Sequence, residues 1–255
     1  MKLPLIVPKS LLTAAVMAML SVAAFGNSVT LYQTSGYYSG VGGEFSAVSP
    51  DSILNPASLG YSPLATASGG FQTFCVEFTE EFSPGTTYQY GISSAAISGG
   101  GAAGGAHLVG STWMDPVSIG TAWLYRQFAT GVLSGYNYGA GRGTSAGALQ
   151  DAVWYLEGEQ PTVGTGSFFV NLAETTLGMS LAGIEADANG LYGVSILNLG
   201  DISGNPEFPN QDQLVLTPGY QATTGDVADG GTTIAMLGGA LLGLGLLRPR
   251  HVQAA

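Results

Sequence analysis

The run Phe71-Gln72-Thr73-Phe74-Cys75-Val76-Glu77-Phe78 carries the only cysteine of the chain. Apolar and polar residues alternate in it, and Gly and Ser precede it, which is the pattern of a β-strand. Residues 145–157 instead have apolar residues at helical spacing, with Gln150 and Trp154 four apart on a neighbouring face. The sequence therefore predicts a strand that carries a cysteine and a helix that carries a glutamine beside a tryptophan.

The two stretches resemble motifs of bacterial thioester domains, in which a cysteine and a glutamine form an internal thioester. The sulfur attacks the carboxamide carbon, ammonia leaves, and an external amine can then capture the acyl group. Because a carboxamide is a poor electrophile, the fold must hold the two groups in contact, which can lower the barrier by about 7 to 11 kcal/mol. The alternative is that Gln150 is a helix-surface glutamine and Trp154 an ordinary core aromatic. Pairing with the lone Cys75 favours the thioester.

The two stretches resemble the paired motifs of bacterial thioester domains, aromatic-Cys-aliphatic and apolar-Gln-x-x-apolar-Trp, in the same order. The resemblance implies that Cys75 and Gln150 are the two ends of a reactive cross-link, with Trp154 beside the carboxamide. It implies a binding protein and not an enzyme, with no catalytic residues. Residues 71–218 are also similar to a group of exported proteins that share this body and a sorting tail.

The two ends of the chain predict export. Residues 1–26 have the layout of a signal peptide, with Lys2 and Lys9, an apolar run and a small-x-small site at its end. Residues 232–247 form a second apolar run before Arg248-Pro249-Arg250, somewhat shorter than the ~20 residues of a usual spanning helix. We therefore expect three parts: a signal peptide (1–26), a body (27–226) and a tail with a transmembrane segment (227–255).

The tail resembles the VPDSG-CTERM sorting signal, a relative of PEP-CTERM on exported proteins of exopolysaccharide-producing Gram-negative bacteria. Val227, Asp229 and Gly231 match the motif, whereas Ala228 and Gly230 depart from it. The resemblance implies a membrane anchor, processing by an exosortase-type enzyme, and final retention at the cell surface or in the extracellular matrix. The alternative is a plain C-terminal membrane helix.

Composition limits the classes of function. The net charge of −11, with a pI near 4.2, excludes a nucleic-acid partner, which needs basic patches. A single cysteine in an exported chain excludes an intrachain disulfide framework. The body contains two arginines and no lysine, so it has no side-chain amine to quench a reactive acyl group, although acidic exported proteins are often poor in lysine.

The order of patterns is strands, then helices, then strands. It predicts an α+β fold, mostly β, with an antiparallel sandwich or barrel-like sheet and two or three inserted helices. The expected strands are 29–33, 44–48, 71–78, 87–92, 191–199 and 212–217; the expected helices are 119–133, 145–157 and 168–181, with a glycine-rich loop at 98–106.

Other constellations are weaker. Glu185, Asp187 and Asn189 have calcium-loop spacing, but position twelve is isoleucine, which favours a turn into the next strand. His107 lacks the partners of a hydrolase triad, and neither a transition-metal site nor a cofactor is expected. Glu77 and its acidic neighbours Glu80 and Glu81 can act as acid or base beside Cys75, or form a solvated strand end.

The favoured function is covalent surface adhesion through an amine-bearing partner; the alternative is a non-covalent structural matrix or envelope protein.

Overall fold

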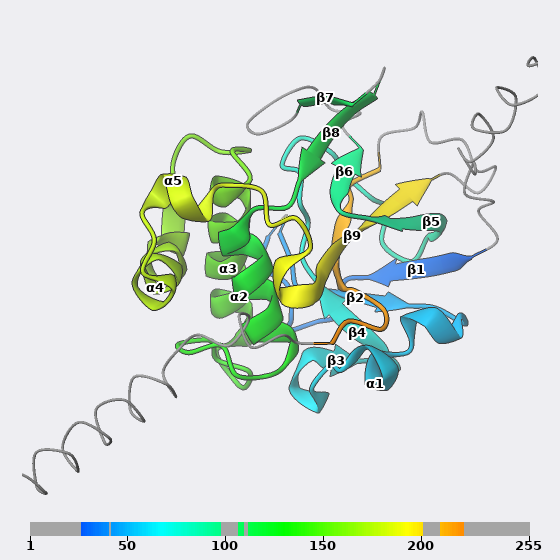
Figure 1. Cartoon of the computed structure of the whole chain (residues 1–255). Coiled ribbons are helices and arrows are strands. Elements are labelled where there is room, and N and C mark those ends of the chain that lie inside the picture. The colour runs from blue at the N-terminus through cyan, green and yellow to red at the C-terminus, as the bar shows by residue number, and fades with distance from the viewer. Residues whose placement is uncertain (1–26, 41, 98–106, 110–111, 201–209, 222–255) are drawn as a thin grey trace, which may run out of the picture.

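The computed structural model describes residues 27–40, 42–97, 107–109, 112–200 and 210–221. Within these ranges the protein has an α+β fold, with a seven-stranded antiparallel sheet, a three-stranded antiparallel sheet and helices packed beside them (Figure 1). This confirms the predicted class. The predicted signal peptide, the sorting tail and the loop at 98–106 lie outside the described residues.

The large sheet has the strand order β10-β9-β5-β1-β2-β4-β3. Its strands are β1 (Ser28–Tyr32), β2 (Phe45–Val48), β3 (Thr66–Ala67), β4 (Gly70–Thr73), β5 (Thr87–Ser93), β9 (Val194–Gly200) and β10 (Gln213–Leu216). Most of these positions follow from the alternation of apolar and polar residues, with boundaries shifted by a few residues.

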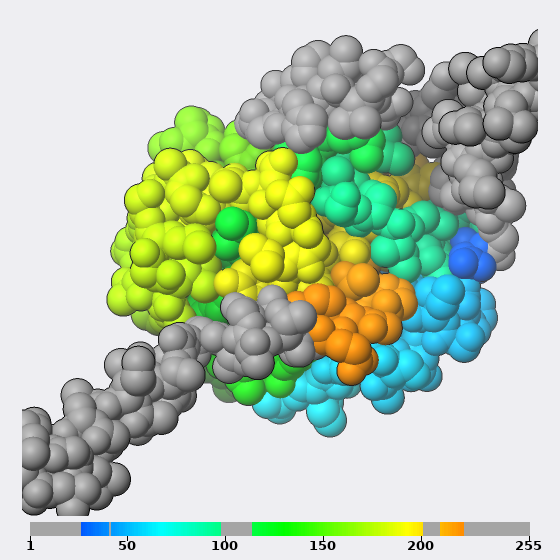
Figure 2. All heavy atoms as spheres, viewed as in Figure 1, coloured from blue at the N-terminus to red at the C-terminus, as the bar shows by residue number. Residues whose placement is uncertain are grey.

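β10, at one end of this order, meets the chain that follows β4, the second strand from the other end, and we call this contact the seam. Cys75 forms an antiparallel bridge with Gln213. On either side of the bridge, the Leu214 amide donates to the Phe74 carbonyl at 3.0 Å and the Val76 amide donates to the Asp212 carbonyl at 3.0 Å. In Figure 2 the orange surface that contains β10 accordingly borders both the yellow region and cyan residues from early in the chain.

The seam corrects the predicted strand at 71–78. β4 ends at Thr73, and the chain then leaves its neighbour β2 to pair with β10. The hydroxyl oxygen of Tyr125, which is fully buried, lies 3.0 Å from the Gln72 carbonyl oxygen and 2.9 Å from the Leu214 carbonyl oxygen. One helix side chain thus contacts the backbone on both sides of the seam.

Three longer helices cover the sheet: α2 (Ile119–Ala129), α3 (Arg142–Leu156) and α4 (Ser167–Leu177). Ser118 caps α2, because its side chain accepts a hydrogen bond from the Thr121 amide. Trp123 is buried, as are Tyr125 and Phe128 on the other side of the helix, so α2 packs on both faces between the sheet and the other helices. Shorter helices lie at α1 (Pro56–Leu59) and α5 (Leu181–Ile184).

The second sheet, in the order β6-β8-β7, was not predicted. It consists of β6 (Ala95–Ile97), β7 (His107–Val109) and β8 (Thr112–Pro116). The predicted strand at 191–199 begins later, at Val194, because the chain first forms a short 3-10 turn in which Tyr192 has a φ of 60°. Among the described helices, none is both long and apolar enough to cross a membrane.

Candidate functional site

Cys75 lies at the seam of the sheet, where it is fully buried and not bonded to another cysteine. It packs against Phe45 of β2 and Trp154 of α3 in a small cluster separate from the main core. The strand before it, the strand opposite it and helix α3 therefore fix its position from three sides. A thiol held in this way has a defined environment, as a cross-link site requires.

The carboxamide of Gln150 is hydrogen-bonded to the backbone of Cys75 on both sides. Its Oε1 atom accepts from the Cys75 amide at 3.0 Å, and its Nε2 atom donates to the Cys75 carbonyl at 2.8 Å. The side chain is buried although it projects from a helix, so it is not a helix-surface glutamine. The structure thus brings together the two residues that the sequence paired across 75 positions.

A second backbone donor reaches the same oxygen. The Gly43 amide donates to Gln150 Oε1 at 3.0 Å, so this carbonyl oxygen accepts two backbone N–H groups. Two such donors withdraw electron density from the carbonyl carbon and stabilise the negative charge that develops on the oxygen when a nucleophile attacks. The arrangement is that of an oxyanion hole, built around the side chain of the protein itself.

Two glycines let the backbone come this close to the helix. A Cβ atom at Gly42 would lie 2.6 Å from Gln150 Cγ and 3.1 Å from Trp154 Cη2, and one at Gly43 would lie 3.2 Å from Gln150 Oε1. Both distances to Gln150 are shorter than ordinary van der Waals contact. This role of the two glycines was not predicted. In the sequence it is marked by the pair Gly42-Gly43, which is separated from strand β2 by Glu44.

Gln213 contacts the sulfur from β10. Its Nε2 atom lies 3.5 Å from Cys75 Sγ and 3.0 Å from the Gln211 carbonyl oxygen, while its Oε1 atom has no hydrogen-bond partner among the described residues. Burial raises the pKa of the Cys75 thiol far above its usual range, the hydrogen bond from Gln213 lowers it and the nearby Glu77 raises it. The protonated thiol is therefore the favoured form of Cys75 at neutral pH.

Trp154 packs against Cys75 from helix α3. Its Nε1 atom donates to the Glu77 carbonyl at 3.1 Å, and the ring of Phe78 meets it edge to face with centroids 5.0 Å apart. The indole therefore links helix α3 to the chain that follows Cys75 and fixes the distance between the two motifs.

An ion pair holds the glycine segment against the same helix. Arg142, in the first turn of α3, donates through Nε and Nη2 to the two carboxylate oxygens of Glu44 at 2.6 and 2.5 Å, and its guanidinium lies 4.0 Å from the centre of the Tyr37 ring. Both charged groups are buried. Because Glu44 directly follows Gly43, this pair fixes the amide that donates to Gln150 relative to α3.

The acidic neighbours of Cys75 are mostly inside the protein. Glu77 and Glu80 are buried, whereas Glu81 is exposed, so a solvated strand end is the wrong description for the first two. The cause is the seam: Glu77 Oε2 accepts from the Asp212 amide at 2.9 Å. Burial raises the pKa of Glu77 well above its usual range, and the Asp212 and Glu80 charges add to this; burial also raises the pKa of Asp212 to about 7.

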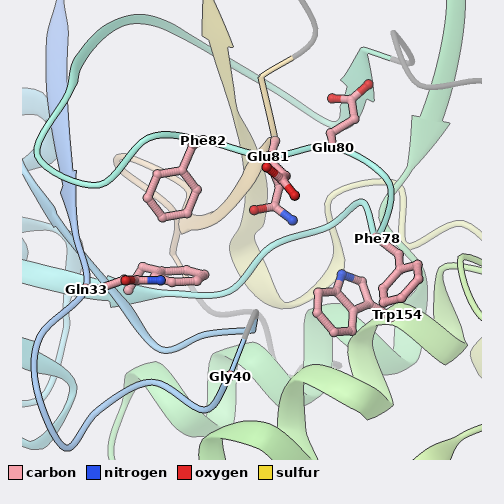
Figure 3. A pocket seen from close by; sticks show the side chains of 9 residues that line it. Gln33, Gly40, Phe78, Glu80, Glu81, Phe82 and Trp154 are labelled. Atoms are coloured by element: carbon pink, nitrogen blue, oxygen red, sulfur yellow. The ribbon is translucent and has the colours of Figure 1, made fainter.

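A cleft of about 390 Å³ opens beside the pair (Figure 3). Phe45, Phe78, Phe82 and Trp154 supply aromatic walls, and Glu80 and Glu81 supply carboxylates. In Figure 3 the segment carrying Glu80, Glu81 and Phe82 passes over the cleft, with Phe78 and Trp154 on one side and Phe82 on the other. This cleft was not predicted, because its walls come from four separate segments of the chain.

The remaining candidates do not join this site. Asn189 and Gly190 have φ values of 50° and 85°, which confirms the expected turn, and Asn189 Nδ2 donates to the Asp187 carbonyl at 3.1 Å. Across the described ranges, no group of three or more His, Cys, Asp or Glu side chains is arranged to hold a metal ion. His107 lies on β7, and Val227, Asp229 and Gly231 lie outside the described residues.

Compared with protein-family models, with curated proteins and with solved structures, the chain has no match. A functional assignment for this protein therefore depends on the geometry around Cys75 and Gln150.

Proposed function

We propose that this protein is an exported, surface-retained adhesion protein in which Cys75 and Gln150 form an internal thioester that captures an amine on a partner. The observation that carries the proposal is the double backbone contact at Gln150 Oε1, from Gly43 and Cys75, each at 3.0 Å. These donors hold the Gln150 carboxamide against the backbone of the residue that carries the lone thiol. The same donors activate a carbonyl towards attack.

Formation of the thioester is balanced without an oxidant or cofactor. Cys75 Sγ bonds to the Gln150 carboxamide carbon, the carbon–nitrogen bond breaks, and the thiol proton leaves with the nitrogen as ammonia. Capture then replaces sulfur: an amine nitrogen bonds to the same carbon, and the proton it loses returns the sulfur to the thiol. Each molecule reacts once, so the protein is a single-use cross-linker and not an enzyme.

Export and retention belong to the same proposal. Residues 1–26 act as the signal peptide, and residues 227–255 anchor the body in the membrane until an exosortase-type enzyme, which recognises the sorting motif of Val227, Asp229 and Gly231, processes the tail. The body then stays at the surface or in the matrix of a Gram-negative cell.

The barrel-like form of the sheet gives the Cys75–Gln150 site its rigidity, since the seam at Cys75 holds the cysteine motif and the glutamine motif in place.

A second candidate function has one observation in its favour. Gln150 makes three good hydrogen bonds to backbone groups, an arrangement that also stabilises a protein in which the two residues never react. In that case the protein is a non-covalent matrix or envelope component.

Labelling with a fluorescent primary amine distinguishes the two candidates. The wild-type body takes up one equivalent of the amine at Gln150, located by peptide mapping, and releases one thiol that is titratable after denaturation. The Cys75→Ala and Gln150→Glu variants take up none, and the second is the best matched because it keeps the shape of the side chain. Absence of labelling in freshly prepared wild-type protein with an intact amide at position 150 supports the structural function instead.

A further inference from the structure

The cleft described above adjoins the Cys75–Gln150 pair through shared side chains. Phe45 and Trp154 line the cleft, and both also pack against Cys75. The cleft therefore lies one side chain away from the sulfur. A molecule bound there touches side chains that pack against Cys75 and so lies close to the pair, as the thioester mechanism requires of an acceptor.

The walls of the cleft suit a cation with an alkyl chain. The face of an aromatic ring attracts an ammonium group, and four aromatic side chains line this space. Glu80 and Glu81 add carboxylates on the segment that crosses the cleft. None of the described residues that line the cleft is basic. The two arginines of the described body are engaged elsewhere, Arg142 with Glu44 and Arg126 over the ring of Tyr220.

We propose that this cleft is the docking site for the acceptor, and that it binds a primary alkylammonium group such as a lysine side chain of the partner. Its role as acceptor site rests on the proposed thioester, but its binding of cations does not. A volume of about 390 Å³ holds one such side chain, at the small end of ligand sites. The methylene chain lies against the aromatic walls, and the ammonium group lies near the carboxylates.

The carboxylates have a chemical task besides attraction. An ammonium ion has no lone pair, so it must lose a proton before its nitrogen attacks the thioester. Glu81, an exposed carboxylate of the cleft lining, is placed to accept this proton. As the carbon–nitrogen bond forms, the carbon–sulfur bond breaks, and the sulfur takes up a proton to restore the Cys75 thiol.

Binding is tested in the Cys75→Ala protein, which cannot form a thioester. The probe is butyltrimethylammonium, a permanent cation that cannot be acylated, and its neutral counterpart is 3,3-dimethylbutanol. Titration is followed through the indole N–H signals in NMR spectra, with the Trp154 signal assigned by Trp154→Phe. We expect saturable binding of the cation, with a shift of the Trp154 signal, at least tenfold tighter than the alcohol and weaker at high salt.

Two variants locate the site. Glu81→Gln and Phe78→Leu alter exposed side chains of the cleft and are expected to weaken the cation at least fivefold, whereas Glu185→Gln, an exposed carboxylate outside it, has no effect. The proposal is overturned if the cation binds no tighter than the alcohol, or if both cleft variants bind it as well as Glu185→Gln does. Cation binding without amine uptake by the wild type refutes the thioester alone, and amine uptake without cation binding refutes the cleft alone.

Discussion

Opening the thioester with methylamine is expected to lower the stability of the body by a predictable amount. The bond joins residues 75 positions apart in the sequence, so it closes a loop of that length in the unfolded chain. By the chain-entropy relation used for disulfides, such a cross-link contributes about 4 to 5 kcal/mol at 25 °C. Methylamine removes the cross-link without changing the sequence.

Other changes at the site are small in comparison. The methylamide that results keeps the carbonyl oxygen facing the amides of Gly43 and Cys75, and it keeps one N–H group to donate to the Cys75 carbonyl. The added methyl group is accommodated at a cost of about 1 kcal/mol, in the range of modest core overpacking. The loss of the cross-link therefore dominates the change in the free energy of unfolding.

Urea unfolding, followed by circular dichroism, measures the effect. With a slope of about 2 kcal/mol per molar urea, the midpoint of the wild-type body falls by about 2 M after treatment. The midpoints of Cys75→Ala and Gln150→Glu do not move, since neither variant holds a cross-link. A wild-type midpoint that stays in place, in a sample shown by mass to have taken up methylamine, refutes the argument that the bond spans this loop.

Three further predictions test other parts of the account. Gly42→Ala should displace Gln150 and lower the free energy of unfolding, measured in urea, by about 1 to 3 kcal/mol. It should also abolish amine uptake and leave the far-ultraviolet circular dichroism spectrum unchanged. Unchanged amine uptake contradicts the close contact between Gly42 and Gln150. Asp115→Asn should raise stability at both pH values, by about 2 to 4 kcal/mol more at pH 8 than at pH 5. Burial raises the pKa of Asp115 from 3.8 to about 8, and the Glu157 charge adds to the shift. The folded wild-type protein therefore binds this proton more tightly than the unfolded chain, and it loses stability as the pH rises between the two pKa values. Equal effects of the substitution at both pH values contradict this prediction. Deleting residues 232–255 should release the body into the medium, and a truncated protein that remains with the cells refutes the anchoring role.

Local patterns in the sequence predicted most of the large sheet and the three longer helices, because alternation and helical spacing are properties of neighbouring residues. They failed at residues 74–78, where the chain leaves β4 to pair with β10. That partner lies well over a hundred positions away, as the contact from Thr73 to Leu214 shows. For the same reason the sequence showed Glu77 as the end of a strand and gave no sign that it is buried.

The site was predicted as a pair of side chains and found as a larger assembly. Cys75, Gln150 and Trp154 follow from residue type, order and helical spacing. The amide donor of Gly43 and the contact of Gln213 with the sulfur do not, because a backbone N–H is the same in every residue and its direction depends on the fold. The Arg142–Glu44 ion pair was not predicted either, because two charged residues this far apart in the sequence are brought together only by tertiary packing.

The intact mass of the purified body, taken under acidic denaturing conditions without added amine, tests the thioester most directly. If Cys75 and Gln150 are joined, the mass is lower than the sequence mass by one ammonia, and both Cys75→Ala and Gln150→Glu have their full sequence mass. A wild-type protein with its full sequence mass, a titratable thiol and an intact amide at position 150 contradicts the account.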